Sequence, residues 1–197
     1  MLAPLARLIL RLGGWTMVGT YPDVPKAVLI AAPHTSNWDG IWGMVYRVAA
    51  RLDIKFFAKE SLFWFPLGPI LRALGGVPLD RNRAGGAVQQ AVDMFRESER
   101  LCFGLSPEGT RRFTEYWKTG FYRIAEQAGV PIVLAFFDYS TRRIGIGRLL
   151  ELSGDREADL KVMREFFAEF VARYPEKVGP VRFRPEPEGE QKKAAVG

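Results

Sequence analysis

Residues 27–40 read AVLIAAPHTSNWDG, and this stretch decides the fold class. Its first six residues, Ala27–Ala32, are a continuous apolar run of the length typical of a buried strand. The segment PHTS contains turn-forming residues, and apolar residues at helical spacing follow from about Trp38 to Arg51. We therefore expect a strand, a turn and a helix, which is the repeating unit of α/β proteins.

The same alternation continues along the chain. Further strands are predicted at Ile54–Ala58, Val77–Leu79, Leu101–Leu105, Val130–Phe137 and, as an edge strand, Arg142–Gly147. Further helices are predicted at Ala87–Glu99, Phe121–Ala128 and Asp155–Arg173. Residues 21–184 should thus form a single α/β domain, with a mostly parallel sheet flanked by helices. Residues 185–197 have little to bury, and we predict a disordered tail there.

Residues 1–20 are predicted to begin with an amphipathic helix. One face would carry Leu5, Leu8, Ile9 and Leu12, and another would carry Arg7 and Arg11. Such a helix either lies on a membrane surface or packs on the core. The longest stretch without an acidic side chain, lysine or arginine is only twelve residues, whereas a membrane-spanning helix needs ~20 apolar residues. With no secretory leader at the start, we expect a cytoplasmic protein that is peripheral on the inner face of the cell membrane.

Composition narrows the classes of partner and cofactor. The chain has 28 Lys and Arg against 22 Asp and Glu, a net charge of +6, which favours anionic partners. It contains one cysteine and one histidine, too few for a protein zinc site or a disulfide framework. The basic residues are not clustered on a groove-reading helix, so nucleic acid is not the expected partner. We expect no metal and no redox cofactor.

The histidine, His34, follows the first predicted strand, at the edge where α/β folds bind ligands. Ser36 and Asp39 have the spacing of a capping box, which predicts that the helix begins near Asn37. Asp39 could then hold one imidazole nitrogen and leave the other as a base. The alternative is that Asp39 only caps the helix and that His34 is structural.

Two further loops are candidates for binding an anion. Ser106–Arg111 follows a predicted strand, and the proline and glycine beside Glu108 favour an irregular loop. Arg111 could hold a phosphate or a carboxylate, although the loop could equally be a surface turn. Gly76–Arg81 is a short strand that leads to Arg81, which is a weaker candidate because basic loops are usually solvated.

An aromatic segment precedes the second of these loops. Five aromatic residues fall within ten positions: Phe56, Phe57, Phe63, Trp64 and Phe65. Prolines that follow them disfavour a regular buried helix, and tryptophan favours a bilayer interface. We expect an acyl-chain pocket or a membrane-facing patch here, and a core cluster is the alternative.

Five blocks in this order resemble the glycerolipid acyltransferase family, which includes the 1-acylglycerol-3-phosphate acyltransferases. The matching blocks are His34 with Ser36 and Asp39, Gly76–Arg81, Pro107–Arg111, Lys118–Gly120 and Val130–Val133. Together they cover about residues 27–137. The chain departs from the family pattern at Pro33, Ser106 and Arg112, where the family usually has asparagine, an aromatic residue and a small residue.

The resemblance implies an O-acyltransferase. His34, oriented by Asp39, would take the proton from a hydroxyl of a lyso-glycerolipid acceptor, which attacks the thioester of acyl-CoA or acyl carrier protein without an acyl-enzyme. The resemblance assigns the acceptor's polar head to Arg81, Glu108, Gly109, Thr110, Arg111 and Lys118. A membrane lipid surface would be a further partner. Two alternatives remain, a phosphate- or lipid-binding module without turnover and a thioesterase that uses water as its acceptor.

Overall fold

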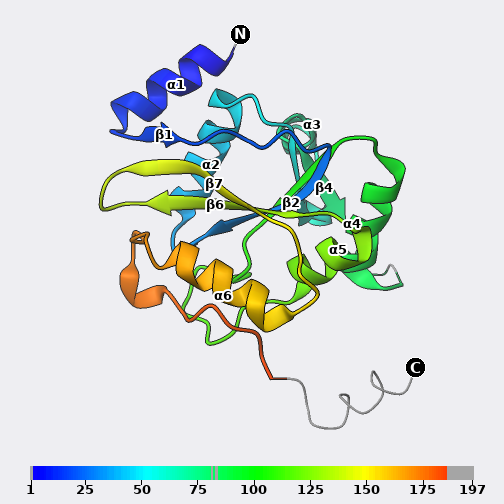
Figure 1. Cartoon of the computed structure of the whole chain (residues 1–197). Helices are drawn as coiled ribbons and strands as arrows, with labels where there is room; N and C mark the ends of the chain where they lie inside the picture. Colours follow the sequence, from blue (N-terminus) through cyan, green and yellow to red (C-terminus); the bar gives the residue numbers. More distant parts are fainter. Residues whose placement is uncertain (1, 81, 83, 186–197) are drawn as a thin grey trace, which may run out of the picture.

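A computed structural model describes residues 2–80, 82 and 84–185 (Figure 1). The strands in it are β1 (Thr16–Val18), β2 (Lys26–Ala32), β3 (Ile54–Lys59), β4 (Gly76–Leu79), β5 (Leu101–Leu105), β6 (Ile132–Asp138) and β7 (Arg143–Leu150). They form one sheet in the order β1-β7-β6-β2-β5-β3-β4. All neighbours pair in parallel except β6 and β7, which are antiparallel. The predicted mostly parallel α/β domain is thereby confirmed.

Helices cover both faces of this sheet. They are α1 (Leu2–Leu12), α2 (Asn37–Ala49), α3 (Leu67–Ala73), α4 (Gly86–Glu97), α5 (Gly120–Ala128) and α6 (Arg156–Phe167), with short 3-10 turns η1 (Glu60–Leu62) and η2 (Pro175–Lys177). In Figure 1, α1 and α2 lie above the sheet, whereas α5 and α6 lie below it.

The central strand β2 shows why its sequence is apolar without alternation. Val28 and Ile30 point into the core beneath α4, α5 and α6, together with Phe103 and Phe121. Leu29 points into the second core, which lies beneath α1 and α2. A strand that is buried on both faces needs apolar residues at every position, as the parallel-sheet prediction requires.

Two predictions were wrong, one about the place of a strand in the sheet and one about where a helix ends. The strand at Arg142–Gly147 is not an edge strand, because β1 pairs along its outer side. The predicted helix at Asp155–Arg173 ends at Phe167 instead. Beyond that residue the chain extends along the end of β6, where the Val171 carbonyl accepts a hydrogen bond from the Tyr139 N–H (2.8 Å). This long-range backbone pairing competes with further helix and is invisible to local periodicity.

Helix α1 packs on the core through its small side chains. Ala3, Ala6 and Leu10 are its buried residues, and Ala6 and Leu10 face the same core as Tyr46 of α2. The four apolar residues that the sequence placed on one face, Leu5, Leu8, Ile9 and Leu12, are exposed, with 79% of Leu12 accessible. They do not pack on the core, which excludes that alternative for this face. Within the described residues, no helix is long and apolar enough to cross a membrane.

The aromatic segment divides into two parts. Phe56 and Phe57 belong to β3 and are half-buried, and the Phe57 ring meets Phe103 edge to face at 4.8 Å. Trp64 and Phe65 lie on the surface, where Phe65 is 84% exposed. The first part therefore lines the interior, whereas the second forms an exposed apolar patch beside α3.

Candidate active site

The loops after β2 and β5 meet because these strands are neighbours in the sheet. Ile30 and Leu105 occupy paired positions, so both loops leave the same carboxyl edge. Glu108 joins them, since its Oε1 accepts a hydrogen bond from the His34 backbone N–H (2.9 Å) and its Oε2 accepts one from Ser106 Oγ (2.6 Å). The carboxylate is buried and fixes the position of His34 relative to the second loop.

His34 and Asp39 form a pair at the start of α2. His34 Nδ1 lies 3.4 Å from Asp39 Oδ2, and the carboxylate is fully buried. The same oxygen accepts hydrogen bonds from the backbone N–H groups of Thr35 and Ser36, both at 2.8 Å. Ser36 is the N-cap with a complete capping box, so the predicted start of the helix at Asn37 is confirmed. Asp39 thus does both things that the sequence left open, because it caps the helix and also faces the imidazole.

Tyr139 completes the surroundings of Asp39 and was missed in the analysis of the sequence. Its Oη donates a 2.5 Å hydrogen bond to Asp39 Oδ1, from a position one residue beyond β6. Burial by itself would raise the pKa of Asp39, but hydrogen bonds from His34, Tyr139 and Ser36 outweigh burial and hold that pKa below its usual value. The carboxyl group is therefore ionised at neutral pH and can support a positive charge on the imidazole. One signal was available, because Tyr139 follows a strand that ends at the same edge as β2.

A C-terminal strap, residues 170–177, holds the same loop from outside. The Tyr174 N–H donates to Thr35 Oγ1 (3.2 Å), directly after His34. The Arg173 guanidinium lies over the rings of Tyr139 and Trp38 at 5.8 and 5.7 Å. Segments 100 or more residues away in sequence therefore converge on the six residues from His34 to Asp39.

Two cavities open beside the His34 ring. The first, of about 230 Å³, lies between the sheet and α2 and is almost entirely apolar, with Met44, Phe56 and Ile146 among its lining residues. The second, of about 640 Å³, lies on the side of β5 and α5. Most of its lining residues are apolar, Phe57 among them, but it also carries Arg111 and Lys118, and we call it the basic cavity after these two cations. His34 is therefore placed where an apolar compartment meets a basic one.

The residues that the resemblance assigns to an acceptor head separate into three groups. Gly109, Thr110, Arg111 and Lys118 line the basic cavity. Gly109 has φ +64 and packs against Lys118, and a Cβ there would lie 3.1 Å from Lys118 Cγ, so other residues would be strained. Glu108 lies between the loops, as described above, and does not line this cavity. Arg81 lies outside the described residues.

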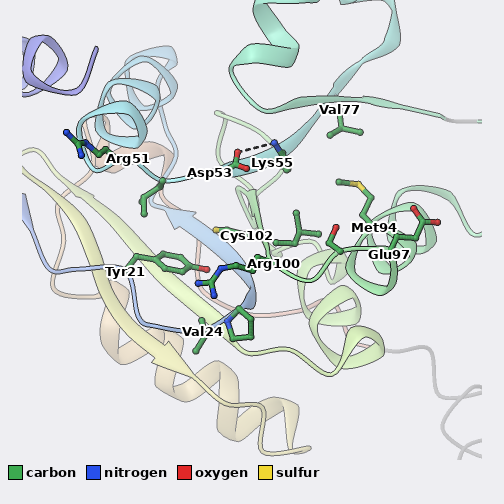
Figure 2. Close-up of a pocket in the computed structure, with 14 residues that line it drawn as sticks. Tyr21, Val24, Arg51, Asp53, Lys55, Val77, Met94, Glu97, Arg100 and Cys102 are labelled. Carbon is green, nitrogen blue, oxygen red and sulfur yellow. Dashed lines mark hydrogen bonds and ion pairs between the residues drawn. The ribbon is translucent and has the colours of Figure 1, made fainter. Parts of the chain in front are cut away.

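Another cavity, of about 520 Å³, lies at the opposite edge of the sheet, near the amino ends of β3 and β5 (Figure 2). The Asp53 carboxylate there is paired with Lys55 at 3.0 Å. Cys102 also lines it, and burial raises the pKa of this thiol to about 11, so it is protonated at neutral pH. The cavity contains none of the residues of the His34 site.

The sequence is similar to that of known acyltransferases. A protein-family description, Acyltransferase, matches residues 18–135. The 1-acyl-sn-glycerol-3-phosphate acyltransferase of Escherichia coli (strain K12) is 34% identical over 125 residues, which are 60% of this chain and 49% of that protein. The protein of the same name from Haemophilus influenzae is 30% identical over 133 residues, or 64% and 53% of the two chains. The chain spans about half the length of the curated relatives it matches.

A solved structure shares the fold. The 1-acyl-sn-glycerophosphate (LPA) acyltransferase from Thermotoga maritima aligns with a TM-score of 0.61 and 19% sequence identity. The alignment covers 88% of this chain and 79% of the other. The likeness establishes a common architecture, including the mostly parallel sheet between helical layers.

Proposed function

The chain belongs to the acyltransferase family, and we propose that it moves a fatty acyl group from a thioester donor to a hydroxyl of a lyso-glycerolipid such as 1-acylglycerol-3-phosphate. The donor would be acyl-CoA or acyl carrier protein. One observation carries this proposal above the others: His34 faces the buried Asp39 at the junction of an apolar and a basic cavity. An amphiphilic substrate needs both compartments.

In the proposed reaction, His34 is the general base. Its Nδ1 faces Asp39, so Nε2 is the nitrogen that takes the proton from the acceptor hydroxyl. The hydroxyl oxygen attacks the thioester carbonyl, the C–O bond forms, and collapse of the tetrahedral intermediate breaks the C–S bond. His34 returns the proton to the leaving thiolate, and no metal or redox cofactor takes part. Asp39 stabilises the imidazolium that exists between these steps.

The general base and the binding site are expected to contribute differently to the rate. A positioned general base contributes on the order of 10²–10⁴ in rate. Holding two substrates in reactive geometry contributes more, up to about 7–11 kcal/mol of the barrier. We assign that positioning to the two cavities: the apolar one for the acyl chain, and the basic one for the acceptor head.

Within the basic cavity, we assign the head-group charge to Arg111 and Lys118, and to Arg81 on the resemblance alone. Gly109 and Thr110 shape the loop that carries Arg111, where Thr110 Oγ1 accepts the Arg112 N–H (3.2 Å). Both carboxylate oxygens of Glu108 already accept hydrogen bonds from protein groups. Glu108 therefore acts as a positioning residue, through the backbone of His34.

We also propose that residues 1–20 lie on a membrane surface, while residues 21–184 form the catalytic domain. The exposed leucine face of α1 supports this, and Trp64 and Phe65 offer a second apolar patch. Arg11 is exposed and could meet anionic head groups. Arg7 is already engaged, because its Nε donates to the Ala49 carbonyl (3.1 Å) and ties α1 to α2. The proposed location is peripheral, on the cytoplasmic face of the membrane.

A panel of acceptors tests the reaction. The purified chain is incubated with acyl-CoA or acyl carrier protein and with lysophosphatidate, other lysophospholipids or no acceptor, and products are identified by mass spectrometry. We expect a diacyl product that depends on the acceptor. Free fatty acid with every acceptor would indicate a thioesterase, and vesicle binding without thioester consumption would indicate a binding module.

A further inference from the structure

A fourth cavity, the outer cavity, lies on the outer side of the β2–α2 loop. It has a volume of about 390 Å³ and is lined by residues 35–38, by Arg111 and Arg112, and by Tyr174 and Lys177. His34 does not line it. The outer cavity therefore lies on another side of the β2–α2 loop than the imidazole, and it adjoins the basic cavity at Arg111, which lines both.

The charge of the outer cavity has one sign. Arg111, Arg112 and Lys177 contribute three cationic side chains, and no acidic residue lines the cavity. Across the described ranges, neither arginine has a carboxylate within ion-pair distance, whereas seven other arginines do. Guanidinium groups left without a partner in one concavity are suited to phosphate, which they bind with paired hydrogen bonds.

Aromatic surface adjoins these cations. Trp38 is 46% exposed at the first turn of α2, and Tyr174 is exposed on the strap. Lys177 Nζ lies 3.9 Å from the centre of the Tyr174 ring, which keeps the ammonium group beside the aromatic surface. Planar rings beside phosphate-binding groups match a ligand that joins a heterocyclic base to phosphate.

The position of the outer cavity indicates which substrate it serves. In a lyso-glycerophosphate, the phosphate is only a few bonds from the reacting hydroxyl, so it must bind on the His34 side of the loop, near Lys118. An anion in the outer cavity must instead be joined to the reacting carbon by a long arm. Acyl-CoA has this form, because a pantetheine arm separates the thioester from the phosphorylated adenosine.

We propose that the outer cavity binds the adenosine 3′-phosphate and diphosphate end of an acyl-CoA donor. The proposal rests on the proposed acyl transfer and adds the identity of the donor. Arg112 and Lys177 belong to this site alone, whereas Arg111 lines both the outer cavity and the basic one. A carrier-protein donor would present a single phosphate and no adenine at this position.

Kinetic constants of Arg112→Gln, Lys177→Gln and the double variant test the assignment, measured in neutral detergent micelles so that vesicle charge plays no part. We expect each single substitution to raise KM for acyl-CoA about tenfold, the loss of one charge-assisted contact, with kcat and the KM for lysophosphatidate unchanged. An S-acyl pantetheine donor, which lacks the nucleotide, should show no change between wild type and variants. Arg148→Gln is the matched control, because Arg148 is exposed on β7 and lines none of these three cavities.

Titration with adenosine 3′,5′-bisphosphate separates this proposal from the reaction itself. We expect the nucleotide to bind the wild-type chain and to bind the double variant at least tenfold more weakly, whether or not any acceptor is acylated. Unchanged KM for acyl-CoA in the double variant would overturn the assignment. So would an increase confined to lysophosphatidate, which would make the cavity part of the acceptor site, or an equal increase for acyl-CoA and S-acyl pantetheine. Activity with acyl carrier protein alone, together with no nucleotide binding, would also overturn it.

Discussion

The two loops that build the site differ in whether their charged side chains have partners within the protein. In the loop after β2, Asp39 is fully buried, and its two oxygens accept hydrogen bonds from Thr35, Ser36 and Tyr139. In the loop after β5, Arg111 and Lys118 are exposed and have no carboxylate within ion-pair distance anywhere in the part of the chain that the structure describes. One loop is complete before any substrate arrives, whereas the other has cations available for a ligand.

This difference indicates that the first loop orients the proposed base and that the second binds the substrate. A base must be held in one orientation, since a misplaced imidazole loses the proton transfer. A cation that binds a substrate phosphate should not first be neutralised by the protein, because the ligand would then have to displace an ion pair. Substitutions in the first loop should therefore lower kcat, and substitutions in the second should raise KM.

Replacing His34 by alanine should have the largest effect. The chain contains no other histidine, so no second imidazole can substitute. We expect kcat to fall on the order of 10³-fold with little change in melting temperature, because the side chain is 22% exposed and its backbone bond to Glu108 remains. Assays of acyl transfer with matched thermal melts measure both. Retention of a tenth of the wild-type kcat would show that His34 is not the general base.

Asp39→Asn comes next. The amide keeps the shape but loses the charge, and its NH₂ group faces N–H and O–H donors that then have no acceptor. We expect kcat to fall on the order of 10²-fold, with a loss of about 2 kcal/mol in the free energy of unfolding. Urea unfolding with steady-state kinetics checks this, and Glu165→Gln, which removes one negative charge from an exposed position of α6, is the control for lost charge. A variant destabilised but fully active would show that Asp39 only caps the helix.

Tyr139→Phe tests the support that Asp39 receives from a residue outside its own loop. Removing one hydrogen bond to Asp39 should lower kcat about tenfold and the free energy of unfolding by about 1 kcal/mol. The bond holds the pKa of Asp39 below its usual value, so its stabilisation is fully present above the unfolded pKa of aspartate and is lost as pH falls through the folded one. The difference in melting temperature between wild type and variant should accordingly be greatest near neutral pH and shrink in acid. A difference independent of pH would mean that Tyr139 contributes packing alone.

Arg111→Gln should have the smallest effect on kcat and should act on KM instead. We expect KM for lysophosphatidate to rise about tenfold with kcat within threefold of wild type, because the lost contact is with a part of the substrate that does not react. The increase should be smaller at high ionic strength, which screens the wild-type contact. Kinetics in two salt concentrations check it. A fall in kcat with KM unchanged would place Arg111 at the reacting atoms and remove the distinction between the loops.

The β2–α2 loop itself could be predicted because its determinants are local. The apolar run Ala27–Ala32, the capping spacing of Ser36 and Asp39, and the turn around Glu108 are all contained within a few residues. The meeting of the two loops followed from a general property of parallel sheets, whose strands share one carboxyl edge. Local chemistry together with that topology was therefore sufficient to place His34 beside the second loop.

What surrounds the loop could not be predicted, because it comes from distant parts of the chain. Tyr139 lies 100 positions from Asp39, and Tyr174 lies 139 positions from Thr35. Neither contact leaves a periodic signal. Helix α1 shows a related limit: its spacing predicted an apolar face correctly, but periodicity does not tell whether a face meets the protein or a bilayer. Small residues, Ala3 and Ala6, decided which face approaches α2.

The central claim is direct transfer of the acyl group to a lipid hydroxyl, and the amounts of two products measured in one reaction test it most directly. Thiol release and diacyl product are quantified together after mixing the purified chain with acyl-CoA, with and without lysophosphatidate. We predict equal molar amounts of the two with acceptor present, and no rapid release of thiol without it, because no acyl-enzyme forms. Thiol released as a burst without acceptor, or accompanied by free fatty acid in place of diacyl lipid, would contradict the account.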